Sequence, residues 1–186
     1  MATETQRYET ISRFEDIEVR EYPSCIVAET ELTGTAETVG NQAFSLLAGY
    51  IFGKNNGGQK IAMTAPVTQS AQSGTKIAMT APVTQTQGAG GVYRVRFVMP
   101  RGYTLDTLPA PRDGRVQLKA MPPQKMAVLR YSGTWSQENY EEHLAKLRAQ
   151  MQRHGLTAQG EPVWARFDPP WKPWFMRHNE IQIPVS

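Results

Sequence analysis

The sequence has one cysteine, no long apolar run and no cluster of like charges, and each shortage excludes a class of protein. The single thiol, Cys25, rules out an internal disulfide and a zinc site built from several cysteines, and it suits a reducing compartment. No stretch approaches the ~20 apolar residues of a membrane-spanning helix, and the first ten residues contain no signal-like pattern. We therefore expect a soluble, cytoplasmic protein without a membrane span.

Charge of either sign is also scarce as a local feature. The 20 Lys and Arg exceed the 17 Asp and Glu by only three, and no basic run occurs. Binding to nucleic acid needs a concentrated basic face, so we expect no nucleic-acid partner. With 186 residues and 40% hydrophobic content, the chain is long enough for one substantial core. We expect a single domain over residues 1–186 and a monomer.

The most visible feature that is present is a tandem duplication within residues 60–85. The ten residues KIAMTAPVTQ occur at 60–69 and again, unchanged, at 76–85. Nothing else recurs at this spacing, so the chain is not a solenoid. In each copy apolar and small residues alternate before a proline, which predicts a short strand with a proline-limited edge. The segment is expected to add one hairpin-like excursion.

The remaining pattern gives two strands, a helix and further strands, twice over. One helix is expected at 35–52, with Thr35 as its cap and Gly53 at its end, and another at about 136–154, followed by Gly155. The expected strands are residues 8–22, 25–32, 116–121, 126–131, 164–167 and 180–185. The sequence therefore predicts an α+β fold, a distorted antiparallel β-barrel with two α-helices, built from two similar β-β-α-β-β halves.

Motifs for catalysis are missing. There is no metalloprotease, Walker A or dinucleotide-binding motif. His143 and His154 lie eleven residues apart on one expected helix, about 16 Å along its axis, and cannot share an ion. Cys25 stands in an alternating strand and is better explained as a small packed side chain than as a nucleophile. We expect no catalytic residues, which favours a protein that is not an enzyme.

An aromatic and proline-rich segment near the end is the best candidate for binding. It consists of DPPWKPWFMR at 168–177, preceded by Phe167. Its prolines exclude a helix and stiffen a loop that holds Trp171 and Trp174, and these rings need a platform. A flat apolar ligand is one such platform, and the protein's own core is the other. Next along the chain, His178 is either a ligand for a metal or an ordinary strand histidine.

Several motifs in a fixed order identify a family that this chain resembles. They are EVREYP at 18–23, GKN at 53–55, KIAMTAPV at 60–67, RFVMP at 96–100, DPPWKP at 168–173 and RHNE at 177–180. On these residues the chain resembles the SOUL haem-binding family, as a bacterial-type member, from about residue 8 to residue 185. The first copy of KIAMTAPVTQ keeps the family's spacing, which indicates that the copy at 76–85 is the insertion.

The resemblance implies a haem site in a shallow apolar groove between the first helix and the loop before the last strand. Two departures from the family matter. Glu21 replaces a proposed axial histidine, and the basic helix residues proposed to meet the propionates are Asn41 and Gly49 here. The resemblance then leaves the propionates to Lys172, with Lys54 or Arg177 as alternatives. His178 stands where the family more usually has an arginine, and it is either this chain's own axial ligand or a neutral variation. The residues that the resemblance places at the groove are Phe44, Leu47, Ala48, Ile51, Phe167, Trp171, Lys172, Trp174 and Arg177.

These expectations lead to one function and two alternatives. The first is a protein that binds haem or a related porphyrin and carries, buffers or sequesters it. The second is an enzyme that modifies a tetrapyrrole or releases its iron. The third is a sensor of other amphipathic small molecules, because the family's two-half fold resembles the effector-binding domains of bacterial regulators.

Overall fold

The chain forms an antiparallel sheet flanked by two helices. The structure is a computed structural model that describes residues 4–61, 64–65, 67–71, 91–168 and 171–186. The strands are β1 (Glu4–Thr5), β2 (Glu9–Arg13), β3 (Ile17–Tyr22), β4 (Cys25–Gly34), β5 (Thr64–Ala65), β6 (Val67–Ala71), β7 (Gly91–Val98), β8 (Gln117–Met121), β9 (Gln124–Tyr131), β10 (Val163–Arg166) and β11 (Asn179–Pro184). The helices are α1 (Ala36–Ile51), α2 (Gln137–Arg153) and the 3₁₀ turn η1 (Trp174–Met176). The expected α+β class with two α-helices is confirmed.

The order of strands shows how the two halves interlock. The nine-stranded sheet runs β2-β3-β9-β11-β10-β6-β7-β4-β8, and β1 pairs separately with β5 in parallel. The first half is β3, β4, α1, β6 and β7, and the second is β8, β9, α2, β10 and β11. Each half lends its first strand to the other, because β3 pairs with β9 and β8 pairs with β4. The expected β-β-α-β-β order therefore occurs twice.

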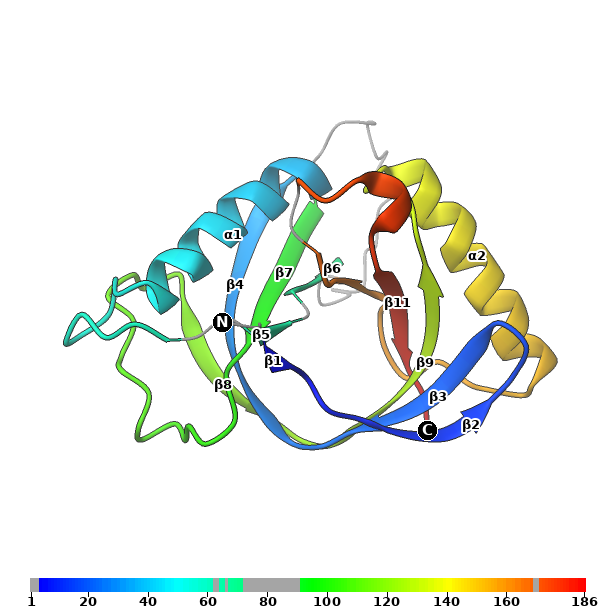
Figure 1. Ribbon diagram of the computed structural model, residues 1–186, viewed down its shortest axis with the longest axis horizontal. Helices are drawn as coiled ribbons and strands as arrows, with labels where there is room; N and C mark the ends of the chain where they lie inside the picture. Colours follow the sequence, from blue (N-terminus) through cyan, green and yellow to red (C-terminus); the bar gives the residue numbers. More distant parts are fainter. Residues whose placement is uncertain (1–3, 62–63, 66, 72–90, 169–170) are drawn as a thin grey trace, which may run out of the picture.

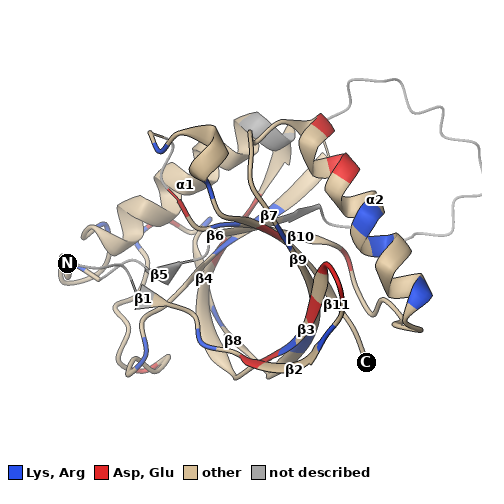
Figure 2. Cartoon of the chain, turned by 45° about the vertical axis from the view of Figure 1, so that its right-hand side comes forward, with Lys and Arg blue, Asp and Glu red and all other residues tan. Residues whose placement is uncertain are grey.

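The sheet is strongly curved but open. Its hydrogen-bonded order ends at β2 and β8, so the expected barrel is not closed. Curvature comes from two interruptions that face each other: Pro23 separates β3 from β4, and Pro122 and Pro123 separate β8 from β9. Proline cannot donate to a ladder, so each strand pair bends there while the pairing resumes in the same register. Figure 2 gives a view along the hollow side of the resulting curl.

Both helices begin and end as their sequences predict. The Thr35 side chain accepts the backbone N–H of Thr38 at the start of α1, and Thr38 returns a bond to the Thr35 backbone. Ser136 caps α2 by accepting the N–H of Asn139. After α1, Gly53 has a φ of 116°, a conformation that glycine adopts without a steric penalty. The caps fix where each helix leaves the sheet.

The first predicted strand is wrong in its extent. Residues 8–22 form two strands, because the N–H of Phe14 bonds the carbonyl of Ile17 at 2.9 Å and turns the chain at Glu15 and Asp16. Aspartate favours such turns, and its signal was hidden by the alternation on both sides. In the duplication, the first copy leads into β5 and β6, and the copy at 76–85 lies outside the described residues.

The two larger hydrophobic clusters lie between the helices and the outer face of the sheet, which the helices cover (Figure 1), and a third, small one of Tyr22, Met126 and Val128 lies on the opposite face. We call the face that the helices cover the helix face and the opposite, concave one the inner face. The α1 cluster is centred on Val39, Ala43, Leu47, Tyr50, Ile51, Val95 and Phe97. The α2 cluster is centred on Ile17, Val19, Leu129, Leu147, Met151, Ile181 and Ile183. Strand residues alternate between faces, so the neighbours of these residues point to the inner face.

Leu47 tests the packing of α1. Its side chain is fully buried in the α1 cluster, whereas Phe44, one turn earlier, is 43% exposed. Leu47→Ala should lower the free energy of unfolding by roughly 2–5 kcal/mol, because it leaves a cavity in a close-packed core. Phe44→Ala should cost clearly less. Chemical denaturation of both variants measures the difference, and equal losses would contradict this packing.

Candidate ligand-binding site

The segment between β10 and β11 carries a contiguous patch of exposed apolar side chains. Residues 167–168 and 171–178 are here called the aromatic loop. Large apolar side chains exposed singly are ordinary, but a cluster of them marks a binding surface. The exposed fractions are 84% for Trp171, 57% for Trp174, 60% for Phe175 and 58% for Met176. The rings therefore do not cap the core, which was the alternative explanation of this segment.

Hydrogen bonds at its base hold the aromatic loop in place. The carboxylate of Asp168 accepts the backbone N–H of His178 and, at 2.6 Å, the ammonium of Lys172. Burial raises the pKa of Asp168, but these two donors lower it by more. The net pKa therefore lies below its ordinary value. The guanidinium Nε of Arg177 donates to the carbonyl of Lys172 at 2.9 Å. Lys172, expected to meet a ligand carboxylate, is thus engaged by Asp168.

The loop bridges the beginnings of the two helices. The carbonyl of Trp174 accepts the N–H of Gly133, shortly before α2. At the other end, the guanidinium of Arg166, the last residue of β10, lies beside Gly40 in the second turn of α1. Figure 1 shows this red and orange segment above the sheet, between α1 and α2. Arg166, just before the loop, therefore lies near the start of α1, whereas the resemblance implied a groove along residues 44–51 of that helix.

The helix residues expected at the groove are distributed differently. Leu47, Ala48 and Ile51 are 0%, 8% and 0% exposed and belong to the α1 cluster. Phe44 is the exposed member, and its ring lies 5.5 Å from that of the buried Phe97. The helical spacing of the four residues put them on one side of α1, but it could not show that most of that side faces the sheet.

His178 connects the aromatic loop to the interior. Its ring stacks on Phe167, with 4.1 Å between ring centroids, and its Nε2 lies 2.8 Å from a carboxylate oxygen of Glu180. Its backbone N–H bonds Asp168. One ring nitrogen is therefore committed to a buried carboxylate, and any iron would have to use the other or displace that contact. Whether His178 binds iron stays a prediction.

The inner face of the sheet holds two groups of ion pairs that sequence reasoning did not identify. Arg20, 5% exposed, donates to Glu180 at 2.9 Å, to Glu18 at 2.7 Å and to the Tyr22 hydroxyl at 3.1 Å. Burial raises the pKa of Glu180, but the contacts from His178, Arg20 and a glutamine amide outweigh it and keep the pKa below its ordinary value. Glu180 is therefore ionised at neutral pH.

The second group surrounds Glu29 on β4. Its carboxylate meets Lys119 at 2.5 Å, Arg96 at 2.8 Å and Arg94 at 3.8 Å. Burial raises the pKa of Glu29, and these cations lower it to a net value below the ordinary one. Figure 2 shows such charged strand positions around the hollow of the curled sheet. Each buried carboxylate of the inner face thus already has cationic partners.

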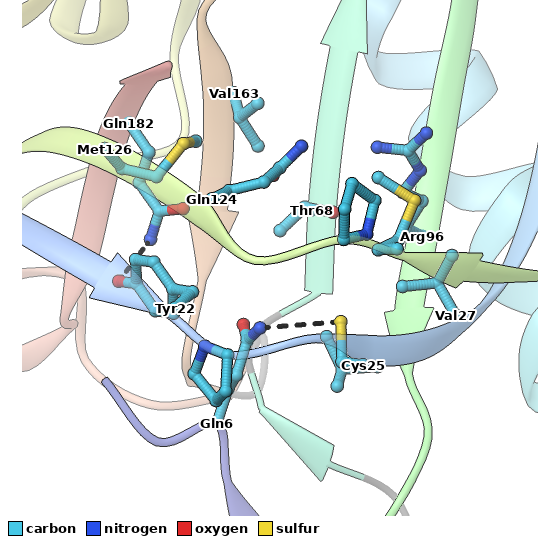
Figure 3. A pocket seen from close by; sticks show the side chains of 14 residues that line it. Gln6, Tyr22, Cys25, Val27, Thr68, Arg96, Gln124, Met126, Val163 and Gln182 are labelled. Carbon is cyan, nitrogen blue, oxygen red and sulfur yellow. Dashed lines mark hydrogen bonds between the residues drawn. The ribbon is translucent and has the colours of Figure 1, made fainter. Parts of the chain in front are cut away.

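A small cavity with both polar and apolar walls lies between these two groups (Figure 3). Its volume is about 60 Å³, and it is lined by Tyr22, Gln182, Thr68, Arg96 and Cys25, among others. The thiol of Cys25 lies 3.8 Å from the amide nitrogen of Gln6, and burial raises its pKa. Drug-sized ligands occupy ~300–1,000 Å³, so the cavity suits ordered water or a very small molecule.

Two further findings limit the chemistry. Within the described ranges, no three side chains of His, Cys, Asp or Glu come together as a metal site would require. Neither described helix is long and apolar enough to cross a membrane.

Glu180→Gln tests the ion pair of the inner face. Removing the carboxylate strands Arg20 in the interior, so the free energy of unfolding should fall by roughly 3–5 kcal/mol at pH 7. The folded-state pKa of Glu180 is depressed, so its contribution is present above the unfolded value of ~4.3 and is lost as pH falls through the folded value. The gap between wild type and variant should therefore narrow in acid.

Glu21→Gln is the matched control, because Glu21 lies on the same strand as Arg20 and is exposed. It should change the free energy of unfolding by less than about 0.5 kcal/mol. Denaturant titrations between about pH 3 and pH 7, which span the ordinary titration range of a carboxyl group, measure both variants. A Glu180→Gln cost that does not depend on pH would show that the carboxylate is not the stabilising group.

The fold is shared with solved structures that are distant in sequence. The EcmrR C-terminal domain is similar with a TM-score of 0.65 at 14% identity, over 96% of this chain and 98% of that one. An uncharacterized conserved protein from Listeria innocua has a TM-score of 0.67 at 14% identity, over 92% of both chains. SAV2435 bound to tetraphenylphosphonium has a TM-score of 0.52 at 10% identity, over 92% and 94%. At these identities the likeness concerns the fold alone.

The sequence itself matches one family. No curated protein matches it, but the model of the SOUL heme-binding protein family covers residues 3–184. That range contains both halves, the polar inner face and the aromatic loop. The chain therefore belongs to the SOUL haem-binding protein family.

Proposed function

We propose that this protein binds haem or a related porphyrin on its outer surface, against the aromatic loop, and serves as a carrier or buffer. The observation that carries the proposal is the exposed group Trp171, Trp174, Phe175 and Met176 on a loop fixed by Asp168. Indole and phenyl faces match the face of a tetrapyrrole in shape and polarity. Family membership supplies the ligand class.

The alternatives within the fold are less suited to a porphyrin. The inner cavity of about 60 Å³ is too small for a porphyrin. A wider, open depression of about 440 Å³ beside the end of α2 is lined by Met151, Leu156 and Pro162 with other residues, none of them aromatic. The aromatic loop offers the aromatic area that the other two surfaces lack.

Charged groups at the loop set the polarity of the site. The guanidinium of Arg177 lies 4.3 Å from the centre of the Trp135 ring, in a cation–π contact at the edge of the loop. The ammonium of Lys172 is already paired with Asp168, so its charge is balanced before a ligand propionate arrives. Cations beside an apolar patch favour a ligand with an apolar face and an anionic edge.

A small-molecule sensor is the second candidate, because the fold is that of the EcmrR C-terminal domain and of SAV2435 with its bound tetraphenylphosphonium. The inner face weighs against a cationic effector in this chain. Glu29 and Glu180, its buried carboxylates, are neutralised by Arg96, Lys119 and Arg20. A cation entering there would meet no uncompensated negative charge.

Thermal shift should therefore show stabilisation by hemin and none by tetraphenylphosphonium.

Hemin titration of a loop variant tests the porphyrin site. The wild-type protein should shift the Soret band and lose tryptophan fluorescence at micromolar hemin. The double variant Trp171→Ala with Trp174→Ala should bind at least about tenfold more weakly, because two stacking faces are lost. Phe52→Ala is the control, since Phe52 is 64% exposed just after α1, away from the loop. Unchanged hemin affinity in the double variant would contradict the site.

The role of His178 is tested by the spectrum. Because its Nε2 is held by Glu180, we expect the porphyrin to be held by its face, and His178→Ala should leave the Soret maximum of the complex in place. The ferric and ferrous spectra of wild type and variant give the comparison. A displaced maximum in the variant would instead assign the iron to His178.

A further inference from the structure

Arg166 is a half-buried cation for which the described part of the chain provides no counter-ion. It ends β10 on the helix face, and its guanidinium carbon lies 4.2 Å from the centre of the Trp164 ring and 5.0 Å from that of Trp135. In the part of the chain that the structure describes, its side chain makes no ion pair, and its buried Nε–H has no hydrogen-bond partner. Burial lowers its pKa to about 10.

The arginine buried on the inner face shows how unusual this is. Arg20 is paired with Glu180 and Glu18. A buried charge without a counter-ion destabilises the folded state. Arg20 escapes this cost through its two glutamates, whereas Arg166 has no such partner among the described residues. Aromatic faces attract a cation, but they accept no N–H bond in the plane of the guanidinium. The two tryptophans therefore leave the Nε–H of Arg166 unsatisfied.

The surroundings of Arg166 are rigid and rich in donors. The indole nitrogen of Trp135 donates to Asn179 at 2.8 Å, which fixes that ring above the strand. Trp164 stacks on Tyr140 with 4.8 Å between ring centroids, and the hydroxyl of Tyr131 lies beside its indole N–H. Gly40 of α1 lies next to the Arg166 guanidinium without a side chain. Among these described groups, the Nε–H of Arg166 is therefore the donor that lacks an acceptor.

Charge at this place is positive. Arg177 lies over the same Trp135 ring, and its positive charge also contributes to the lowered pKa of Arg166. The nearest acidic group along the chain, Asp168, is engaged by Lys172 and by the His178 backbone. Arg166 and Trp135 are only partly buried, and although the Nε of Arg166 is covered, its terminal nitrogens are not among the buried atoms without a partner.

We propose that Arg166 is the anchor of an anion site that takes a carboxylate carried by a flat aromatic body. The carboxylate pairs with the terminal nitrogens of the guanidinium and balances its charge, while the body lies against Trp135 and the neighbouring aromatic loop. In the proposed porphyrin complex this anion is a propionate. Only this identification of the anion rests on the proposed function. The preference for an anionic over an uncharged aromatic ligand therefore comes from Arg166. Lys172 already has a counter-ion, Asp168.

The direct test compares the binding of 2-naphthoate with that of its uncharged analogue 2-naphthamide. Binding is measured by NMR titration, from the indole N–H signals of Trp135 and Trp164. Wild-type protein should bind the carboxylate at least about tenfold more tightly, the gain typical of a charge-assisted bond. In Arg166→Gln this ratio should fall to near one. Arg166→Met, which fills the space between the rings without charge, should behave alike if Gln does not fold.

Arg130→Gln is the matched control, because Arg130 is exposed on β9, which β11 separates from β10, and it should leave the ratio unchanged. A ratio that persists in both Arg166 variants, or no preference in the wild type, overturns the anion site. Another arm compares protoporphyrin with its dimethyl ester. If naphthoate discriminates but neither porphyrin binds, the anion site stands and the proposed porphyrin function fails.

Discussion

The ion pair of Arg20 and Glu180 is the constraint on which the arrangement of this protein depends. It joins β3 to β11 across β9 on the inner face, at a place where both side chains are almost completely buried. Breaking either partner would leave a charge in the interior, so the two strands and the curl between them are held together. Through Glu180 the same pair also reaches His178 and the base of the aromatic loop.

This interior decides where a ligand can go. A curled sheet with a hollow centre would normally offer its concave side, as small barrels do. Here ion-paired arginines and glutamates, glutamines and the small apolar cluster of Tyr22, Met126 and Val128 fill that side, leaving about 60 Å³. Exposed aromatic area is instead found outside, where Asp168 holds the loop and the rings of Trp171 and Trp174 remain in solvent.

Much of the fold was predictable, and the parts that were not share a reason. Local signals placed both helices, because Thr35 and Ser136 cap them and glycines follow them. The loop before β11 was identifiable from its prolines. Pairing between distant strands leaves no local signal, so neither the open order of the sheet nor the contact of Arg20 with Glu180, 160 residues apart, could be predicted. The faces of Leu47 and Ile51 were unpredictable for the same reason.

Arg166 shows how such long-range placement turns an ordinary residue into a functional one. In the sequence it is one arginine among several on amphipathic strands. Strand order sets it between the two helices, beside two indoles and away from every described carboxylate partner. The arginines of the inner face have counter-ions, and the cavity there is small. Arg166, beside the exposed aromatic loop, has no counter-ion in the described part of the chain. An unbalanced charge next to apolar surface is the combination that an amphipathic anion would complete.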